Sequence, residues 1–105
     1  MLERGDSTET ALGAGETYTG KWFDVQRAEQ IVGAVKADAG GTLYVEQSQD
    51  VGDPREVHAD AERSYTSGEA LGFEVPPLCR YARVRYVNGS SAQSSFHLHV
   101  DRKRR

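Results

Sequence analysis

Two histidines near the C-terminal end have the spacing of metal ligands on a β-strand. His97 and His99 are separated by one residue, so both side chains project to the same face of an extended strand. Asp101 continues that face, and His58 could join it from another strand. Imidazole and carboxylate groups are common metal ligands, but nothing in the spacing fixes a third and a fourth ligand. A solvent-facing polar stripe explains the pattern better, so we predict no metal site and no cofactor.

The other reactive residue types form no catalytic motif. Cys79 is the only cysteine, which excludes an internal disulfide and a cysteine-based zinc site. No histidine has a spacing that marks it as the base for this thiol, so we expect Cys79 to be a small packing residue. Asp50, Asp53 and Glu56 lack the alternating ligands of a calcium loop and are expected to form a polar turn. We therefore predict that the protein is not an enzyme.

Aromatic side chains could provide a binding surface instead. Tyr44, Tyr65, Tyr81 and Trp22 are candidates for a sugar-binding platform, because tyrosine and tryptophan favour interfaces. Packing between two sheets is the alternative, and it explains most of these residues as part of a core.

Basic residues are concentrated toward the C-terminus. Residues 1–75 contain 15 acidic and 6 basic residues, whereas residues 76–105 contain 7 basic residues and one acidic residue. The chain ends in the basic run Arg102, Lys103, Arg104 and Arg105. We expect a basic C-terminal tail over residues 102–105 that is either solvated and mobile or an electrostatic anchor for an acidic partner. Direct nucleic-acid binding is not expected, because the rest of the chain is acidic and no aromatic platform accompanies the tail.

Glycine and proline break the chain at short intervals, and the segments between them are rich in Val, Thr, Tyr and Phe. This spacing is typical of all-β proteins. The clearest strands are expected over residues 80–88 and 94–101, where apolar and polar residues alternate, and Asn88-Gly89 favours a two-residue hairpin turn between them. Further strands are expected over residues 17–25, 30–38, 42–48, 55–59 and 70–75, with a polar stretch over 62–67. We predict an antiparallel two-layer β-sandwich of seven to eight strands, either jelly-roll or immunoglobulin-like.

The strand predicted over residues 80–88 presents two arginines on its outer face. Val84 stands between Arg83 and Arg85, so when Val84 points into the core the two arginines point away from it. They are candidates for binding an acidic partner, and cross-strand pairing with Glu46 inside the sheet is the alternative. Together with the four basic residues at the C-terminus, they are the residues that we predict to bind a partner.

The chain is expected to form one domain over residues 1–105, with a flexible N-terminal arm over residues 1–8. It has 28% charged and 37% hydrophobic residues and a formal net charge of −3, and no apolar run is long enough to span a membrane. It begins with Met1, without a secretion signal, and ends just after the last predicted strand, so we expect a complete small gene product. Residues 1–16 and 101–105 are expected to become ordered on binding a partner.

Three stretches of the chain resemble segments of small bacteriophage virion proteins. They span Gly41 to Asp50, Cys79 to Gly89, and Gly20 to Val25. Ala92-Gln93 and the strand at residues 96–100 follow in the same order, so the resemblance covers about residues 15–100. The resemblance implies a β-sandwich scaffold used in phage particles and brings no catalytic residues with it.

The resemblance implies a non-enzymatic structural protein of a bacteriophage particle. We favour a capsid decoration or minor head protein that binds and stabilises the capsid shell. Its partners would be the major capsid protein or other virion subunits, in a homo-oligomer or multicopy assembly, with no membrane involved. It would be made in the host cytoplasm and located in the virion, on the capsid surface rather than the tail. The alternative is a tail or receptor-binding protein that recognises a host cell-surface glycan.

Overall fold

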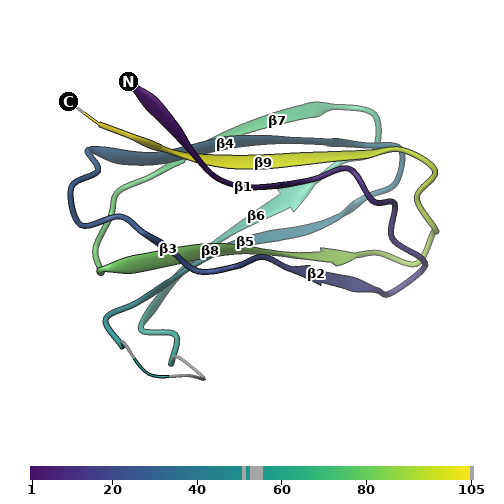
Figure 1. Cartoon of the computed structure of the whole chain (residues 1–105). Helices are drawn as coiled ribbons and strands as arrows, with labels where there is room; N and C mark the ends of the chain where they lie inside the picture. Colours follow the sequence, from purple (N-terminus) through teal and green to yellow (C-terminus); the bar gives the residue numbers. More distant parts are fainter. Residues whose placement is uncertain (51, 53–55, 105) are drawn as a thin grey trace.

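The computed structural model describes residues 1–50, 52 and 56–104. All regular secondary structure within these residues is β-strand (Figure 1). The strands are β1 (Leu2–Thr8), β2 (Thr17–Thr19), β3 (Phe23–Asp24), β4 (Gln30–Ala37), β5 (Gly41–Ser48), β6 (Ala59–Tyr65), β7 (Ala70–Val75), β8 (Tyr81–Asn88) and β9 (Phe96–Lys103). They form two antiparallel sheets that pack face to face. Within the described residues, no helix has the length and apolar character that a membrane crossing requires.

The strand order is that of a jelly roll. One sheet has the order β1-β9-β4-β7, and the other has the order β2-β8-β5-β6, with β3 also paired to β8. Because β2 and β3 pair with successive parts of β8, they occupy one position at the sheet edge. The chain then folds as four nested antiparallel pairs: β1 with β9, β2 and β3 with β8, β4 with β7, and β5 with β6. The predicted two-layer sandwich is confirmed, and of the two topologies considered it is the jelly roll.

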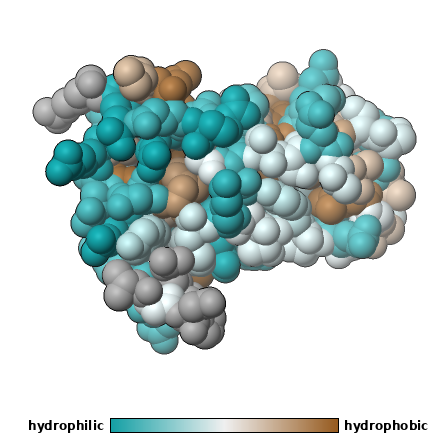
Figure 2. Space-filling view, viewed as in Figure 1, coloured by the Kyte–Doolittle hydropathy of each residue, from teal (hydrophilic) through white to brown (hydrophobic). Residues whose placement is uncertain are grey.

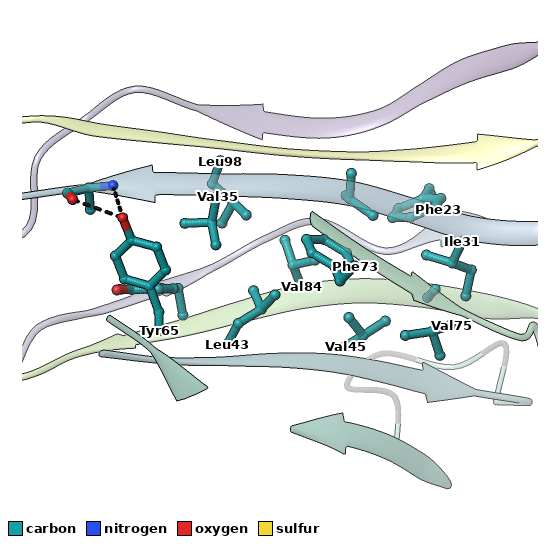
Figure 3. Close-up of a cluster of buried hydrophobic side chains, with 14 of the residues drawn as sticks. Phe23, Ile31, Val35, Leu43, Val45, Tyr65, Phe73, Val75, Val84 and Leu98 are labelled. Atoms are coloured by element: carbon teal, nitrogen blue, oxygen red, sulfur yellow. Dashed lines mark hydrogen bonds between the residues drawn. The ribbon is translucent and has the colours of Figure 1, made fainter. Parts of the chain in front are cut away.

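Alternating side chains from both sheets form the core. In β8, Ala82, Val84 and Tyr86 are buried while the residues between them are partly exposed, and β9 shows the same alternation over its first half. Figure 3 shows the apolar side chains of the two sheets pointing toward one another. At one end of this core, the Tyr65 hydroxyl accepts a hydrogen bond from the Ala37 N–H (2.8 Å) and lies 2.9 Å from the Ala37 carbonyl oxygen. This contact ties β6 of one sheet to β4 of the other.

The predicted hairpin between residues 80–88 and 94–101 is wrong. Both strands form, as β8 and β9, but they belong to different sheets and do not pair. The buried Asn88 side-chain amide donates hydrogen bonds to the carbonyl oxygens of Gly13 (2.8 Å) and Ser91 (2.9 Å). Gly89 packs so closely that a Cβ atom there would lie 2.8 Å from the Gly40 carbonyl oxygen. Asn88-Gly89 therefore anchors a crossover between the sheets instead of a two-residue turn.

The flexible arm predicted over residues 1–8 is also corrected, because residues 2–8 form strand β1. This strand pairs with β9 along one edge of its sheet, and the register shifts between Arg4 and Asp6. The buried Gly5 lies at that shift, where a Cβ atom would be 2.7 Å from the Phe23 ring. The segment carries little apolar alternation, so its strand character comes from pairing with β9 and could not be predicted locally.

Two other predicted segments change their bounds. The strand expected over 55–59 and the polar stretch over 62–67 are replaced by β6, which runs from Ala59 to Tyr65; residues 53–55 lie outside the described chain. As an edge strand, β6 leaves most of its side chains exposed and so lacks an apolar alternation. The strand expected over 17–25 is divided at Gly20, whose N–H donates to the Val84 carbonyl (2.8 Å). The strands predicted over 30–38, 42–48 and 70–75 are confirmed to within one residue.

Candidate functional site

The two arginines predicted on the outer face of β8 bind the same carboxylate. Glu46 lies on β5 directly opposite Arg83. Arg83 Nε donates a hydrogen bond to Glu46 Oε1 (2.8 Å), and Arg85 Nε donates one to Glu46 Oε2 (3.1 Å). We call Arg83, Arg85 and Glu46 the closed clamp. The structure thus realises the cross-strand pairing, which was one of the two roles considered for these arginines.

Aromatic rings cover the closed clamp from both sides. The Arg83 guanidinium lies 4.4 Å from the centroid of the Trp22 ring, and the Arg85 guanidinium lies 4.1 Å from that of Tyr44. The exposed side-chain fraction is only 7% for Glu46, 23% for Arg83 and 30% for Arg85. Stacking on an aromatic face stabilises a guanidinium and holds it in place. Most of the charge at this position is therefore already compensated within the fold.

A second set of residues repeats this arrangement at the end of β9. Arg104 Nε forms an ion pair with Glu3 Oε1 on β1, and Arg102 Nη2 lies 3.8 Å from Glu3 Oε2. We call Arg102, Arg104 and Glu3 the open clamp. Here Glu3 and Arg104 are more exposed, at 32% and 41%, whereas Arg102 is 24% exposed, much as Arg83 is. No aromatic ring stacks on either guanidinium within the described residues. Arg102 makes its short hydrogen bond elsewhere, from Nη1 to the Asp24 carbonyl oxygen (2.6 Å).

The open clamp borders a cavity of about 360 Å³. Its lining consists of Asp24, Gln26, Arg27, Ala28, Arg102 and Arg104. Arg27 comes from the turn between β3 and β4, so three arginines from two separate segments line the cavity. Hydrophilic side chains gather at this end of the sandwich, which carries both chain ends (Figures 1 and 2). This cavity is the site with the highest local positive charge among the described cavities.

The acidic N-terminal segment and the basic C-terminal segment, each expected to order on a partner, pair with one another instead. Besides the contacts of Glu3, Arg4 Nε lies 2.7 Å from Asp101 Oδ1, a carboxylate that is largely buried. Of the two roles expected for the basic tail, the mobile one is corrected for residues 102–104, since Arg102 and Lys103 belong to β9 and the Arg104 N–H donates to the Met1 carbonyl (2.8 Å). Their opposite charges explain the pairing. Arg105 lies outside the described residues.

A tyrosine fastens β1 to the second sheet. The Tyr18 hydroxyl donates a hydrogen bond to Asp6 Oδ2 (2.6 Å), and the Lys21 N–H donates to the same oxygen (3.3 Å). Burial raises the pKa of the Tyr18 phenol, and the hydrogen bond and charge of Asp6 raise it further. β1 is therefore held both along its sheet and across the sandwich.

The histidines considered as metal ligands each contact a carboxylate. His97 Nδ1 lies 3.2 Å from Glu9 Oε1, and His99 Nδ1 lies 3.5 Å from Asp101 Oδ2. His58 is in another part of the fold, where its Nδ1 accepts a hydrogen bond from the Gln49 N–H (3.0 Å). Among the residues that the structure describes, no three His, Cys, Asp or Glu side chains come together as a metal site would require.

The loop that carries Cys79 depends on a buried glutamine that the sequence did not single out. Gln47 Oε1 accepts hydrogen bonds from the N–H groups of Leu78 (2.7 Å) and Cys79 (3.1 Å), and Gln47 Nε2 donates to the Pro76 carbonyl (3.1 Å). Cys79 is half-buried and in the free thiol form. Gln47 thus satisfies three backbone groups of the loop between β7 and β8.

The acidic residues that could have suggested a calcium loop make turn contacts where they are described. Asp50 Oδ1 accepts a hydrogen bond from the Gly52 N–H (2.9 Å), and Asp50 Oδ2 accepts one from the Glu56 N–H (3.4 Å). Asp53 lies outside the described residues. This arrangement is that of an Asx-type polar turn.

Glu3 of the open clamp and Arg27 of the cavity are marked by no local sequence motif. Glu3 stood in a segment expected to be flexible, and Arg27 is an isolated arginine between two predicted strands. Only the pairing of β1 with β9 brings Glu3 to the C-terminal arginines, and only the turn after β3 brings Arg27 there. A long-range charge complementarity between residues 1–16 and 101–105 was the one available indication.

Comparison with known proteins finds relatives over nearly the whole chain. The family model described as the N-terminal domain of the uncharacterised protein YqxG matches residues 3–103. The uncharacterised protein YqxG of Bacillus subtilis (strain 168) is 31% identical over 96 residues, which cover 88% of this chain and 31% of that protein.

Two solved structures have a similar fold. The crystal structure of the PBSX exported protein XepA matches with a TM-score of 0.79 and 28% identity, over 100% of this chain and 37% of that chain. A structure from Bacillus endospore appendages, which form a novel family of disulfide-linked pili, matches with a TM-score of 0.59 and 14% identity, over 100% of this chain and 88% of that one. The latter likeness concerns the fold alone. The chain spans about a third of the length of YqxG and of XepA.

Proposed function

The chain belongs to the family of the YqxG N-terminal domain, and we propose that it is a non-enzymatic structural protein of a phage-related assembly that acts outside the cell in which it is made. Its function would be to contact other protein subunits through the outer faces and the ends of the sandwich. The observation that carries the proposal is the likeness over the whole chain to XepA, a PBSX exported protein. The resemblance of three stretches to phage virion proteins supports the same class.

Within this class, the finer proposal is a capsid decoration or minor head protein. A small jelly roll in which polar or charged residues make up most of the lining of two described cavities suits adhesion to a shell of repeated subunits. Many symmetric copies turn modest individual contacts into strong attachment through avidity. Its partners would be the major capsid protein or other virion subunits. Candidates for the contact are Arg83, Arg85 and the four C-terminal basic residues Arg102, Lys103, Arg104 and Arg105. The closed clamp weakens the case for Arg83 and Arg85, since Glu46 already binds both.

The second candidate function is a tail or receptor-binding protein that recognises a glycan. It needs exposed aromatic faces on which a sugar ring can stack. Tyr65 is buried in the core, and guanidinium groups lie over the rings of Trp22, Tyr44 and Tyr81. These contacts favour the structural role over glycan recognition.

The proposal is tested by locating the protein in a producing culture. Particles would be separated into DNA-filled heads, tails and particle-free medium, and the protein in each fraction would be quantified by mass spectrometry against the major capsid protein. A decoration or minor head protein is expected in the head fraction, for a decoration protein at a copy number proportional to the major capsid protein.

Other outcomes contradict one part of the proposal or all of it. Recovery with tails at a few copies would favour the receptor-binding alternative. Recovery only in particle-free medium would contradict the decoration role and leave an exported structural protein. Retention inside intact cells, or substrate turnover by the purified protein, would contradict the proposal as a whole.

A further inference from the structure

We propose that the cavity beside the open clamp is a binding site for a phosphate-type oxyanion, with Arg27, Arg102 and Arg104 as its ligands. The inference goes beyond the structural role and does not depend on it. Guanidinium groups bind phosphate and sulfate oxygens in pairs of parallel hydrogen bonds, which gives arginine an advantage over lysine at such sites.

The charges around the cavity leave an uncompensated positive excess. Of its lining residues, three are arginines and one, Asp24, is acidic. One Asp24 carboxylate oxygen accepts a hydrogen bond from the Gln26 N–H (2.8 Å), so it is occupied by the turn. Glu3 compensates part of the charge of Arg104 from outside the lining, but it lies beyond hydrogen-bond distance from Arg102. Arg27 makes no ion pair with a described residue.

Arg102 is held in place before any ligand arrives. Its Nη1 donates to the Asp24 carbonyl, and its side chain is only 24% exposed. Its Nε is buried and has no hydrogen-bond partner in the described chain. A guanidinium that is partly withdrawn from water and incompletely hydrogen-bonded interacts more strongly with an anion than a fully hydrated one does. Little side-chain entropy is lost when such a preorganised group binds.

The closed clamp shows by contrast what the open clamp lacks. On β8, one buried carboxylate accepts a hydrogen bond from both arginines, and aromatic rings cover the guanidinium groups. On β9, the carboxylate of Glu3 serves mainly one arginine, and a cavity replaces the rings. The cavity, at about 360 Å³, is large beside the roughly 30 Å³ that one water occupies in the liquid. An oxyanion with several acceptor oxygens would accept hydrogen bonds from the solvent-accessible N–H groups of these arginines.

The test is a titration of the ¹⁵N-labelled protein with inorganic phosphate at constant ionic strength, followed by NMR. Saturable shifts are expected for the Nε–H signals of Arg27, Arg102 and Arg104, while the Arg83 and Arg85 signals stay unchanged. R27Q should weaken phosphate binding by about tenfold, since a charge-assisted pair of hydrogen bonds is lost. R63Q, which removes an exposed arginine on β6, is the matched control and should leave the affinity unchanged.

Two further ligands identify the chemistry of the site. Glycerol phosphate should bind about as well as inorganic phosphate when the site takes a phosphate group carried on a larger molecule, and markedly more weakly when it takes the free ion. Acetate should bind at least tenfold more weakly than phosphate. Non-saturable shifts, equal weakening by R27Q and R63Q, or acetate binding equal to that of phosphate would overturn the proposal. None of these results depends on whether the protein is found in heads, tails or medium.

Discussion

The closed clamp on β8 and the open clamp on β9 have the same local sequence pattern but different surroundings. In each, two arginines separated by one residue bind a glutamate of the neighbouring strand. In the closed clamp the glutamate is 7% exposed and rings of Trp22 and Tyr44 stack on the arginines. In the open clamp the glutamate is far more exposed, and the arginines border a cavity. The pattern Arg-x-Arg on a strand therefore does not by itself distinguish a structural ion pair from an available one.

The physical difference is solvation. A carboxylate removed from water loses several kcal/mol of hydration, and it becomes dependent on its partners. An exposed ion pair gains little because water and salt compete with it, and it contributes about 0–1 kcal/mol. The arginines of the closed clamp therefore hold the sheet together, while those of the open clamp can still bind a ligand.

The largest expected contrast comes from the residue between the two arginines of each clamp. V84D should abolish folding, because it places an unpaired charge in the core beside Tyr86 and costs more than about 4 kcal/mol. K103D should leave the protein folded, because Lys103 is exposed. Circular dichroism and heteronuclear NMR spectra of both variants provide the measurement. Equal tolerance of the two changes would mean that the assignment of strand faces is incorrect.

The next contrast compares the two glutamates. E46Q should lower the free energy of unfolding by about 2–3 kcal/mol, since it leaves two partly buried guanidinium groups without their carboxylate. E3Q should lower it by less than about 1 kcal/mol, because the Glu3 and Arg104 side chains are more accessible to water than Glu46 is. Urea unfolding at neutral pH gives both values. A loss for E3Q as large as that for E46Q would remove the distinction between the clamps.

A smaller effect is expected from the aromatic cover. Y44L keeps an apolar side chain at this position but removes the ring under Arg85, and it should cost about 1 kcal/mol. R104Q, in the clamp without rings, should change the free energy of unfolding by about 0.5 kcal/mol or less. Thermal unfolding followed by circular dichroism compares the two variants. If Y44L were neutral, the ring would not contribute to holding Arg85.

The smallest effect concerns salt. Raising NaCl from about 0.1 M to about 1 M shortens the screening length from about 10 Å to about 3 Å. The cost of E3Q should then fall toward zero, whereas the cost of E46Q should change little because that pair is shielded from water. Urea unfolding of wild type and both variants at the two salt concentrations tests this. A salt-dependent cost for E46Q equal to that for E3Q would show that the closed clamp is hydrated.

Local alternation predicted much of the fold. The buried set in β8, with Val84 inward and its arginines outward, follows from a period of two, and so do the bounds of β4, β5 and β7. Substitutions on the outer face of β8 should be less harmless than the alternation alone suggests. R83D, which a face assignment alone would treat as harmless, would place a second carboxylate beside Glu46 and remove the stack on Trp22.

The pairing of strands could not be predicted from local alternation. Asn88-Gly89 favours a hairpin locally, yet the buried amide of Asn88 donates hydrogen bonds to the carbonyl groups of Gly13 and Ser91, and β9 crosses to the opposite sheet. Segments with few apolar residues, β1 and β6, were misjudged because their strand character comes from a neighbour and not from their own pattern. The open clamp and Arg27 depend on those pairings, so the candidate site was predicted only as a basic C-terminal run.

By itself, the sequence determined that the chain is an all-β sandwich, which side of β8 and of most of β9 faces the core, and that a surplus of basic residues lies near the C-terminus. These properties are local, since the side-chain period and the charge of a segment depend only on residues that are neighbours in the sequence. The tertiary structure alone decided the jelly-roll order, the pairing of β1 with β9, and which arginines are neutralised and which are open. Those outcomes depend on contacts between residues far apart in the chain, and on how much water reaches each charge once the sheets have packed.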